Sequence, residues 1–159
     1  MEKGAILFGI FRGKVSEGVD FADDQARAVV SIGIPLLPIG APEVSHKMKY
    51  NDEKWVMYNN PFTRVPNSLR PLPGREWYDA QGCRALNQGL GRAIRHINDW
   101  GPIFIIEERF ELPHAPARSR LPEWVNRSAT SFSSVEDSIR SLQEFVRVKL
   151  QERLPTQSS

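Results

Sequence analysis

The stretch from residue 84 to residue 100, RALNQGLGRAIRHINDW, constrains the fold of this chain more than any other part of the sequence. Residues three and four apart share one face of a helix, so a helix here places Gln88, Arg92 and Arg95 together. The opposite face carries only apolar side chains, namely Leu86, Leu90, Ala93, Ile94 and Ile97. The apolar face can pack on a sheet while the planar guanidinium groups remain available to phosphate oxygens. The spacing therefore predicts a helix that ends near residues 98 and 99 and holds its arginines toward an anion.

Two glycines lie in the middle of this predicted helix. Gly89 and Gly91 each cost about 1 kcal/mol relative to alanine in a helix interior, so we expect another part of the protein to approach closely there. Taken alone, the pattern also fits an ordinary solvated surface of arginines, and a second motif is needed to choose between the two interpretations.

The second motif, RGKVSEGVDF, follows the apolar run Ala5–Phe11. That run is typical of a strand buried in a parallel sheet, which places the motif in a loop at the strand's carboxyl end, where open α/β sheets bind ligands. The residues of the loop that suit a phosphate or its counter-ions are Gly13, Ser16, Glu17, Gly18 and Asp20. The motif is not a P-loop, because GIFRGKV has three residues between its glycines and valine in place of Ser or Thr. The alternative to a phosphate-binding loop is an ordinary turn that contains glycine and exposed charged residues.

Composition limits the kinds of site that the chain can hold. The 21 basic and 19 acidic residues leave a net charge of +2, so any basic binding surface must be local. Cys83 is the single cysteine, which excludes an internal disulfide and a multi-cysteine zinc or iron–sulfur site in these residues. We predict that Cys83 is a buried structural thiol and not a nucleophile. His46 and His96 have no partner at metal-ligand spacing, so we predict no metal site.

The strand and helix signals indicate an α/β domain. The apolar runs at 27–35 and 103–106 predict two further strands, which with 5–11 give three strands around one helix. Residues 43–50 predict a short helix, and the proline-rich stretch 51–73 predicts an irregular insertion. The aromatic residues in this insertion fit either a DNA-stacking surface or local core; they are Trp55, Tyr58 and Phe62.

The carboxyl-terminal part of the chain is predicted to form two helices. Residues 121–127 predict a short helix with Trp124 packed inward, and residues 135–154 predict a longer amphipathic helix that Ser133 or Ser134 caps. This last helix fits either a packed terminal helix or a partner-binding one. We therefore predict a domain over 1–125 and a terminal helix with a polar tail over 126–159. No apolar run approaches the ~20 residues that a bilayer-spanning helix needs.

The two motifs together resemble those of a known enzyme family. Gln88-x-x-Gly91-Arg92-x-x-Arg95 resembles motif VI of superfamily 2 helicases, and the run from Gly13 to Phe21 resembles their motif V. The longer stretches RGKVSEGVDF and LPGREWYDAQGCRALNQGLGRAIRHINDWG are similar to sequences of the XPD-type iron–sulfur DNA helicases. Within that family they are most similar to the Fanconi anaemia group J branch. The resemblance extends from about residue 5 to residue 110 and continues more weakly through Trp124.

This resemblance implies a fold and an ATP-binding role. It implies an α/β, RecA-like second motor domain of the P-loop NTPase type, which binds ATP and Mg²⁺ jointly with a first motor domain that this sequence does not contain. On the family pattern Arg95 is the arginine finger, Arg92 its companion and Gln88 a polar link to the phosphates or the attacking water. The implied nucleotide-side residues of motif V are Glu17, Gly18 and Asp20. The Walker lysine, the magnesium-binding acidic motif and the cluster cysteines belong to the family's first domain, so we expect that the chain begins earlier.

The resemblance also implies partners. The implied DNA-contacting residues are Arg12, Gly13, Lys14 and Ser16. The expected partners are DNA, as a single strand or a duplex junction, and the first motor domain of the same protein, with no membrane. The function implied is 5′-to-3′ DNA unwinding in DNA repair, and the location implied is the nucleus. Two alternatives stay open: a non-catalytic module that binds DNA or a partner, and a nucleotide-independent interaction fold that retains the motifs.

Overall fold

The computed structural model describes residues 4–13, 26–62, 65–91, 94, 99–110 and 116–152. The chain forms two compact units, Met1–Asn126 and Arg127–Ser159, and each is considered separately. Seven residues with predicted roles lie outside the described ranges; they are Lys14, Ser16, Glu17, Gly18, Asp20, Arg92 and Arg95.

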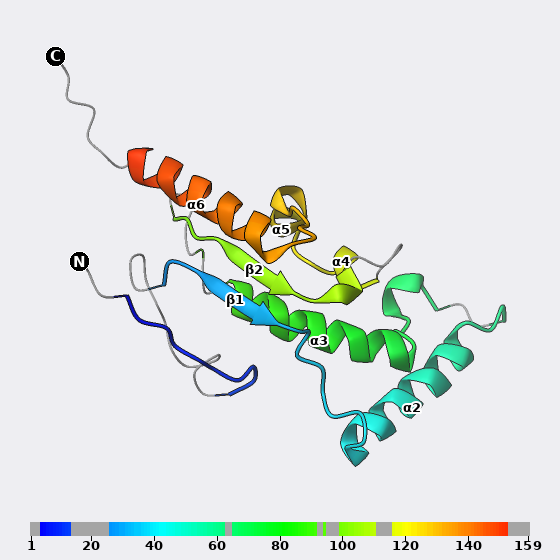
Figure 1. Cartoon of the computed structure of the whole chain (residues 1–159). Coiled ribbons are helices and arrows are strands. Elements are labelled where there is room, and N and C mark those ends of the chain that lie inside the picture. Colours follow the sequence, from blue (N-terminus) through cyan, green and yellow to red (C-terminus); the bar gives the residue numbers. More distant parts are fainter. Residues whose placement is uncertain are drawn as a thin grey trace. The chain divides into compact units, whose positions relative to one another are not determined.

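The first unit is built on two parallel strands, β1 (Val29–Ile32) and β2 (Ile103–Ile106) (Figure 1). Their register pairs Val29 with Ile103 and Ile32 with Ile106. Both strands confirm predictions from their apolar runs. The third predicted strand, at 5–11, is wrong: within the described residues the sheet consists of β1 and β2 alone, and Phe8 is 86% exposed. A strand needs backbone partners on a neighbouring strand, and the apolar run has none in this sheet.

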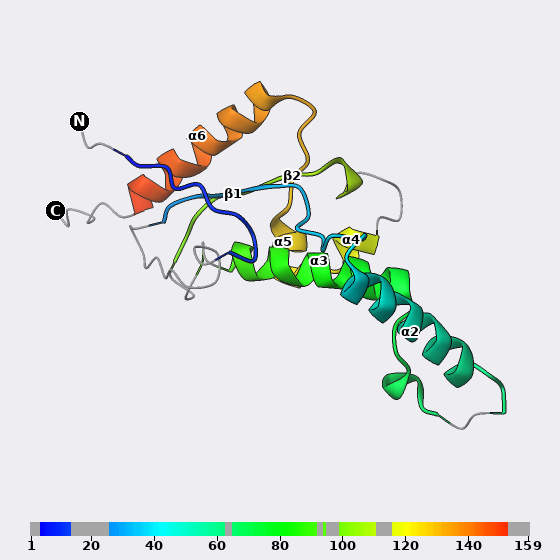
Figure 2. The ribbon, with the colours of Figure 1, turned by 90° about the horizontal axis from the view of Figure 1, so that it is seen from below.

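Helix α3 (Gly74–Leu90) covers one face of the sheet (Figure 2). Leu86 and Leu90 have no exposed surface and form the core with Leu121 and Val125. The partly buried apolar residues packed against this core are Phe11, Val29, Ile34, Ile103, Ile105 and Phe110. The helix positions its apolar face on the sheet as the sequence predicts.

The predicted extent of this helix is wrong at its carboxyl end. It ends at Leu90, Gly91 is the C-cap with its N–H donating to Asn87 O, and Ile94 is not helical. The cause is local, because two glycines close together weaken the helix and glycine favours helix ends. The helix that carries Gln88 therefore ends at Leu90, and Arg92 and Arg95 lie outside the described residues.

Helix α2 (Pro42–Tyr58) is longer than the helix predicted at 43–50. Its second half occupies the start of the stretch 51–73, so the prediction of an irregular insertion is wrong there. Val44 and Asn51 are buried, and Asp52 Oδ1 accepts a hydrogen bond of 2.7 Å from the Gly74 N–H at the start of α3. These contacts stabilise a helix whose sequence has little amphipathic pattern.

The rest of the stretch 51–73 contains one short element, the 3₁₀ turn η2 (Asn67–Leu69). Of the aromatic residues with two open interpretations, Phe62 is 92% exposed and Trp55 is 38% exposed, so neither is core. Tyr58 is half-buried.

After β2 come η3 (Glu108–Phe110), α4 (Pro116–Ser119) and α5 (Glu123–Ser128). Helix α5 confirms the short helix predicted from LPEWVNR. The inward packing predicted for Trp124 is wrong, because Trp124 is 44% exposed while Leu121 and Val125 are buried. Val125, the buried residue of α5, directly follows Trp124, and successive residues of a helix point in different directions around its axis, which turns Trp124 away from the core.

In the second unit, α6 (Val135–Glu152) begins at the predicted cap. Ser134 Oγ accepts a hydrogen bond of 3.1 Å from the Asp137 N–H, and the Ser134 hydroxyl donates to Asp137 Oδ2. No residue of α6 is buried. Over the described residues, no helix has both the length and the apolar character that crossing a membrane requires.

Candidate functional site

The segment that leads into the first motif packs on the end of α3. A Cβ atom at Gly89 would lie 2.7 Å from Cε1 of Phe11, so any side chain at this position would force the Phe11 ring to move. The close approach predicted at Gly89 is confirmed. At Gly91 the nearest atom to such a Cβ is Asn87 O, at 3.4 Å, which belongs to the preceding turn. Gly91 therefore ends the helix, and among the described residues no other segment comes within 4 Å of such a Cβ.

Arg12 fixes the start of the first motif against the middle of α3. Its Nη2 donates to Gln81 O at 2.9 Å and lies 3.4 Å from Pro35 O. Its φ of 64° is in the left-handed region that non-glycine residues rarely adopt. Gly13 N–H donates to Ile10 O at 3.0 Å, which closes a tight turn. The DNA contact predicted for Arg12 stays a prediction, and the structure gives this side chain a positioning role.

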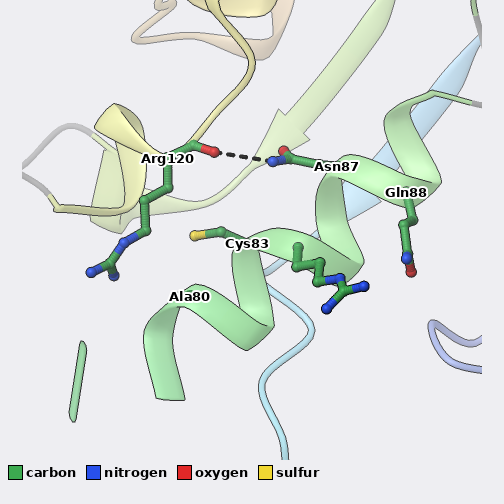
Figure 3. Close-up of a pocket in the computed structure, with 6 residues that line it drawn as sticks. Ala80, Cys83, Asn87, Gln88 and Arg120 are labelled. Atoms are coloured by element: carbon green, nitrogen blue, oxygen red, sulfur yellow. Dashed lines mark hydrogen bonds between the residues drawn. The ribbon is translucent and has the colours of Figure 1, made fainter. Parts of the chain in front are cut away.

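Gln88 lies on the exposed face of α3, away from Leu86 and Leu90. It borders an open groove whose other lining residues are Ala80, Cys83, Arg84, Asn87 and Arg120 (Figure 3). Asn87 Nδ2 donates to Arg120 O at 3.0 Å across this groove. Among the described residues, the buried atoms Asn87 Oδ1 and Arg120 Nη1 have no hydrogen-bond partner. Both atoms are enclosed by the chain, so the groove does not present them to a ligand.

Sequence reasoning missed Asn87 and Arg120. Asn87 precedes Gln88 directly, yet the helical pattern assigned it to neither face. Arg120 stands in a segment of proline and arginine with no period, so no sequence signal placed it beside α3. Its Nη2 lies 3.8 Å from Glu76 Oε2 on that helix.

Cys83 is 2% exposed, which confirms the buried thiol predicted from sequence. Burial raises the pKa of the thiol, and the nearby positive charge of Arg120 offsets only part of that rise. A raised pKa keeps the sulfur protonated at neutral pH, whereas a nucleophile needs the thiolate. The thiol therefore contributes packing to the groove and not reactivity.

The side chain of Glu107 connects the segments that follow the two strands. Glu107 follows β2, and its Oε2 accepts a hydrogen bond of 3.0 Å from Ile34 N–H, just after β1. Both of its oxygens also accept from the Arg109 guanidinium, each at 2.6 Å. Hydrogen bonding from Arg109 holds the pKa of Glu107 below its ordinary value. This pair holds the loop after β1 beside β2.

A second ion pair holds the segments that enter the two strands. Arg27 Nη1 lies 3.2 Å from Asp99 Oδ1 and 3.2 Å from Trp100 O. Its guanidinium carbon lies 5.0 Å from the Trp100 ring centroid, in cation–π range. Gly91 and Asp99 are the described residues on either side of residues 92–98, the segment that carries Arg92 and Arg95.

The structure brings three of the predicted site residues into one region. Arg12 and Gly13 lie at the start of the first motif and Gln88 on the helix that receives it. The seven others lie outside the described ranges. The part of the chain that the structure describes contains no group of three acidic, histidine or cysteine side chains able to hold a metal ion.

Comparison with known proteins defines the class of protein to which this site belongs. Residues 1–128 match the helicase C-terminal domain, and the chain belongs to this family. It is similar to the Fanconi anemia group J protein homolog of Gallus gallus, with 39% identity over 142 residues. It is also similar to regulator of telomere elongation helicase 1 of Bos taurus, with 39% identity over 145 residues, and to the Arabidopsis thaliana homolog, with 36% over 146.

These alignments cover most of this chain and little of each relative. They include 89%, 91% and 92% of this chain, but only 10%, 11% and 14% of the three relatives. The chain thus spans about a tenth of the length of the curated relatives that it matches.

Proposed function

We propose that this chain is the carboxyl-terminal part of the second, RecA-like motor domain of an ATP-dependent DNA helicase. The observation that carries the proposal is the packing of the segment before one motif onto the helix that begins the other. Phe11 fits against Gly89, and Arg12 donates to Gln81 O. Motifs that are far apart in sequence and that must couple nucleotide to DNA need such a direct contact. The small parallel sheet with α3 on one face fits this fold.

The nucleotide side of the site centres on Gln88 and the two arginines that follow it. Gln88 is exposed beside a groove that Arg84 and Arg120 also line, so the region suits an anionic group. ATP with Mg²⁺ would supply the phosphoryl group that transfers. Arg95 would stabilise the charge of the transition state, with Arg92 beside it. Residues of motif V complete this side of the proposal; they are Glu17, Gly18 and Asp20.

The magnesium ligands are proposed to come from a first motor domain in the same protein. The described residues include no group that could hold a metal ion. An iron–sulfur cluster, if the full protein follows the XPD-type pattern, requires cysteines outside this chain, because Cys83 is the only one within it.

The DNA side is proposed to use the loop that Arg12 begins. Gly13 keeps a tight turn there, since a Cβ would lie 2.9 Å from Ile10 O. Lys14 and Ser16 would contact phosphates, which position DNA without reading its sequence. Translocation in the 5′-to-3′ direction, a role in DNA repair and a nuclear location belong to this proposal and follow from the family resemblance.

The test is Arg95→Ala in the full-length protein that contains this chain. We expect ATP binding to remain and kcat to fall by a factor that reaches ~10³ where an arginine finger acts. A fall in kcat with little change in KM is the signature of a contact made in the transition state. Arg95→Lys should restore little activity, because an ammonium group lacks the planar fork of donors.

Arg75→Ala is the matched control. It removes an arginine from the first turn of α3, where the side chain is 68% exposed and pairs with Asp79. The control should keep its turnover. Unchanged kcat in Arg95→Ala, or an equal loss in Arg75→Ala, would remove Arg95 from the catalytic site.

A further inference from the structure

One face of α2 alternates lysine and tyrosine. Lys47, Tyr50, Lys54 and Tyr58 are spaced by three, four and four residues and therefore line one side of the helix. The Lys47 ammonium lies 4.7 Å from the Tyr50 ring centroid. Lys54 lies 5.7 Å from the same centroid and 5.9 Å from that of Tyr58. These four residues are named the Lys–Tyr stripe.

The packing of α2 against α3 leaves this stripe accessible. The buried residues of α2 are Val44 and Asn51. Lys47 is exposed and Tyr50 is 50% exposed, while Lys54 is half-buried. The stripe thus borders the packed side of the helix and retains a ring and an ammonium group in solvent.

The charged side chains of α2 lie on different sides of the helix. Asp52 is engaged with the Gly74 N–H on the side that meets α3. Lys49 falls on the far side from Lys47 by helical spacing. Two acidic residues border the stripe, Glu43 one turn before Lys47 and Glu53 three residues after Tyr50. The four stripe residues themselves carry two positive charges and no negative one.

Alternating cations and aromatic rings match the chemistry of single-stranded nucleic acid. Single strands present phosphates at regular intervals and bases with accessible faces, and proteins bind them with cationic grooves and stacking rings. The four residues extend over about 16 Å of helix at 1.5 Å per residue. Cation–π pairing within the helix accounts for the geometry of the stripe, but it does not require half of the Tyr50 surface to remain in solvent.

We infer that the Lys–Tyr stripe of α2 binds single-stranded DNA, with the lysine ammonium groups on phosphates and Tyr50 stacked on a base. The inference rests on the proposed function only for the choice of DNA as ligand. It adds a binding surface outside both helicase motifs, on a helix that the sequence pattern only half predicted.

The test measures the binding of a fluorescein-labelled oligothymidylate of about 20 nucleotides to the 159-residue chain by anisotropy, at several salt concentrations. Lys47→Ala with Lys54→Ala should lower the slope of log affinity against log salt by about 1.4, because each phosphate that is no longer neutralised reduces it by about 0.7. Tyr50→Ala should weaken binding by about fivefold to a hundredfold, the range expected for one stacked base. Tyr50→Phe, which keeps the ring, should bind like the original chain.

Lys49→Ala is the matched control, because it removes one positive charge from the same helix but from the far side. It should change neither affinity nor slope, and thermal unfolding should show that every variant folds. Absence of binding by the original chain, an equal loss in Lys49→Ala, or full affinity in the stripe variants would overturn the inference. Equal competition by a poly-glutamate peptide would also overturn it, because a peptide of carboxylates offers no base to stack.

The outcome is separable from that of the proposed function. Stripe variants that lose DNA affinity while Arg95→Ala leaves turnover unchanged would support the stripe and contradict the catalytic proposal. Stripe variants with full affinity, together with an inactive Arg95→Ala enzyme, would contradict the stripe and support the catalytic proposal.

Discussion

Neighbouring residues of α3 have opposite environments. Leu86 and Leu90 have no exposed surface, Gly89 lies under the Phe11 ring, and Gln88 is exposed. The three adjacent positions Gln88, Gly89 and Leu90 are therefore exposed, closely approached and buried in turn. Substitutions there should separate effects on folding from effects on function.

Leu90→Ala should lower the free energy of unfolding by about 2 to 5 kcal/mol, because it leaves a cavity in the core. Gln88→Ala, on the exposed face, should change it by less than about 0.5 kcal/mol. Urea denaturation followed by circular dichroism measures both. A larger loss in Gln88→Ala than in Leu90→Ala would mean that the two faces of the helix are assigned backwards.

Glu107 makes part of the folding stability of the first unit depend on pH. Its pKa is lower in the folded chain than in the unfolded one, chiefly through the hydrogen bonds from Arg109. The carboxylate therefore stabilises the fold fully above the ordinary glutamate pKa of about 4.3, and this contribution is lost as the pH falls through the lowered folded-state value. The side chain is 6% exposed, so solvent screens this interaction little.

Glu107→Gln should cost about 1.5 to 3 kcal/mol at neutral pH, the range for hydrogen bonds to a charged group. It should also flatten the fall of stability in acid. Urea midpoints measured from pH 7 down to pH 3 test this, with Glu108→Gln as a control at an exposed neighbour. An acid limb as steep as that of the original chain would show that Glu107 does not carry the effect.

At the scale of elements, the helices are stabilised in different ways. Helix α3 buries seven residues and ends where glycine interrupts it. Helix α6 buries none. Its contacts include a cap and exposed ion pairs such as Arg147 with Glu144 at 2.7 Å. Such pairs contribute little individually, so the cap should matter more to α6 than any one of them.

Ser134→Ala should destabilise the first turn of α6 by about 1 kcal/mol, because it leaves the Asp137 N–H without its cap. Hydrogen exchange of the amides at 136–138 reports this loss directly. Ser133→Ala removes the adjacent serine and is the control. Equal acceleration of exchange in both variants would contradict Ser134 as the cap.

At the scale of the whole molecule, the groups that an ATPase needs do not all lie in this chain. The sequence has no P-loop. The relatives are roughly ten times longer than the part of them that aligns, since the aligned part is 10% or 11% of each. Catalysis by the proposed motor would require two domains that close around one nucleotide.

The isolated 159-residue chain should therefore neither hydrolyse ATP nor unwind DNA. A sensitive phosphate-release assay with and without single-stranded DNA measures this. A DNA-stimulated signal that disappears in Arg95→Ala would contradict the prediction, whereas activity that survives the substitution indicates a contaminant. The coding sequence upstream of Met1 provides a second check, because a helicase should encode GxxxxGK[ST] and an acidic box there.

Local signals in the sequence predicted a substantial part of the structure. Short apolar runs predicted β1 and β2, the run LPEWVNR predicted α5, and the serines at 133 and 134 predicted the cap of α6. The two helicase motifs identified the family. These features depend on neighbouring residues or on residues one turn apart, and such interactions can be read from the order of the side chains alone.

Contacts between distant segments decided the rest. Helix α2 extends to Tyr58 because Val44, Asn51 and Asp52 find partners across from it, and the apolar run at 5–11 is not a strand because the described sheet gives it no neighbour. The groove beside Gln88 exists only because Arg120 folds back over α3. The family and most elements were thus determined by the sequence itself. The ends of α2 and α3, the exposure of Trp124 and the lining of the groove came from tertiary packing, because burial and hydrogen-bond partners depend on residues that are remote in the chain.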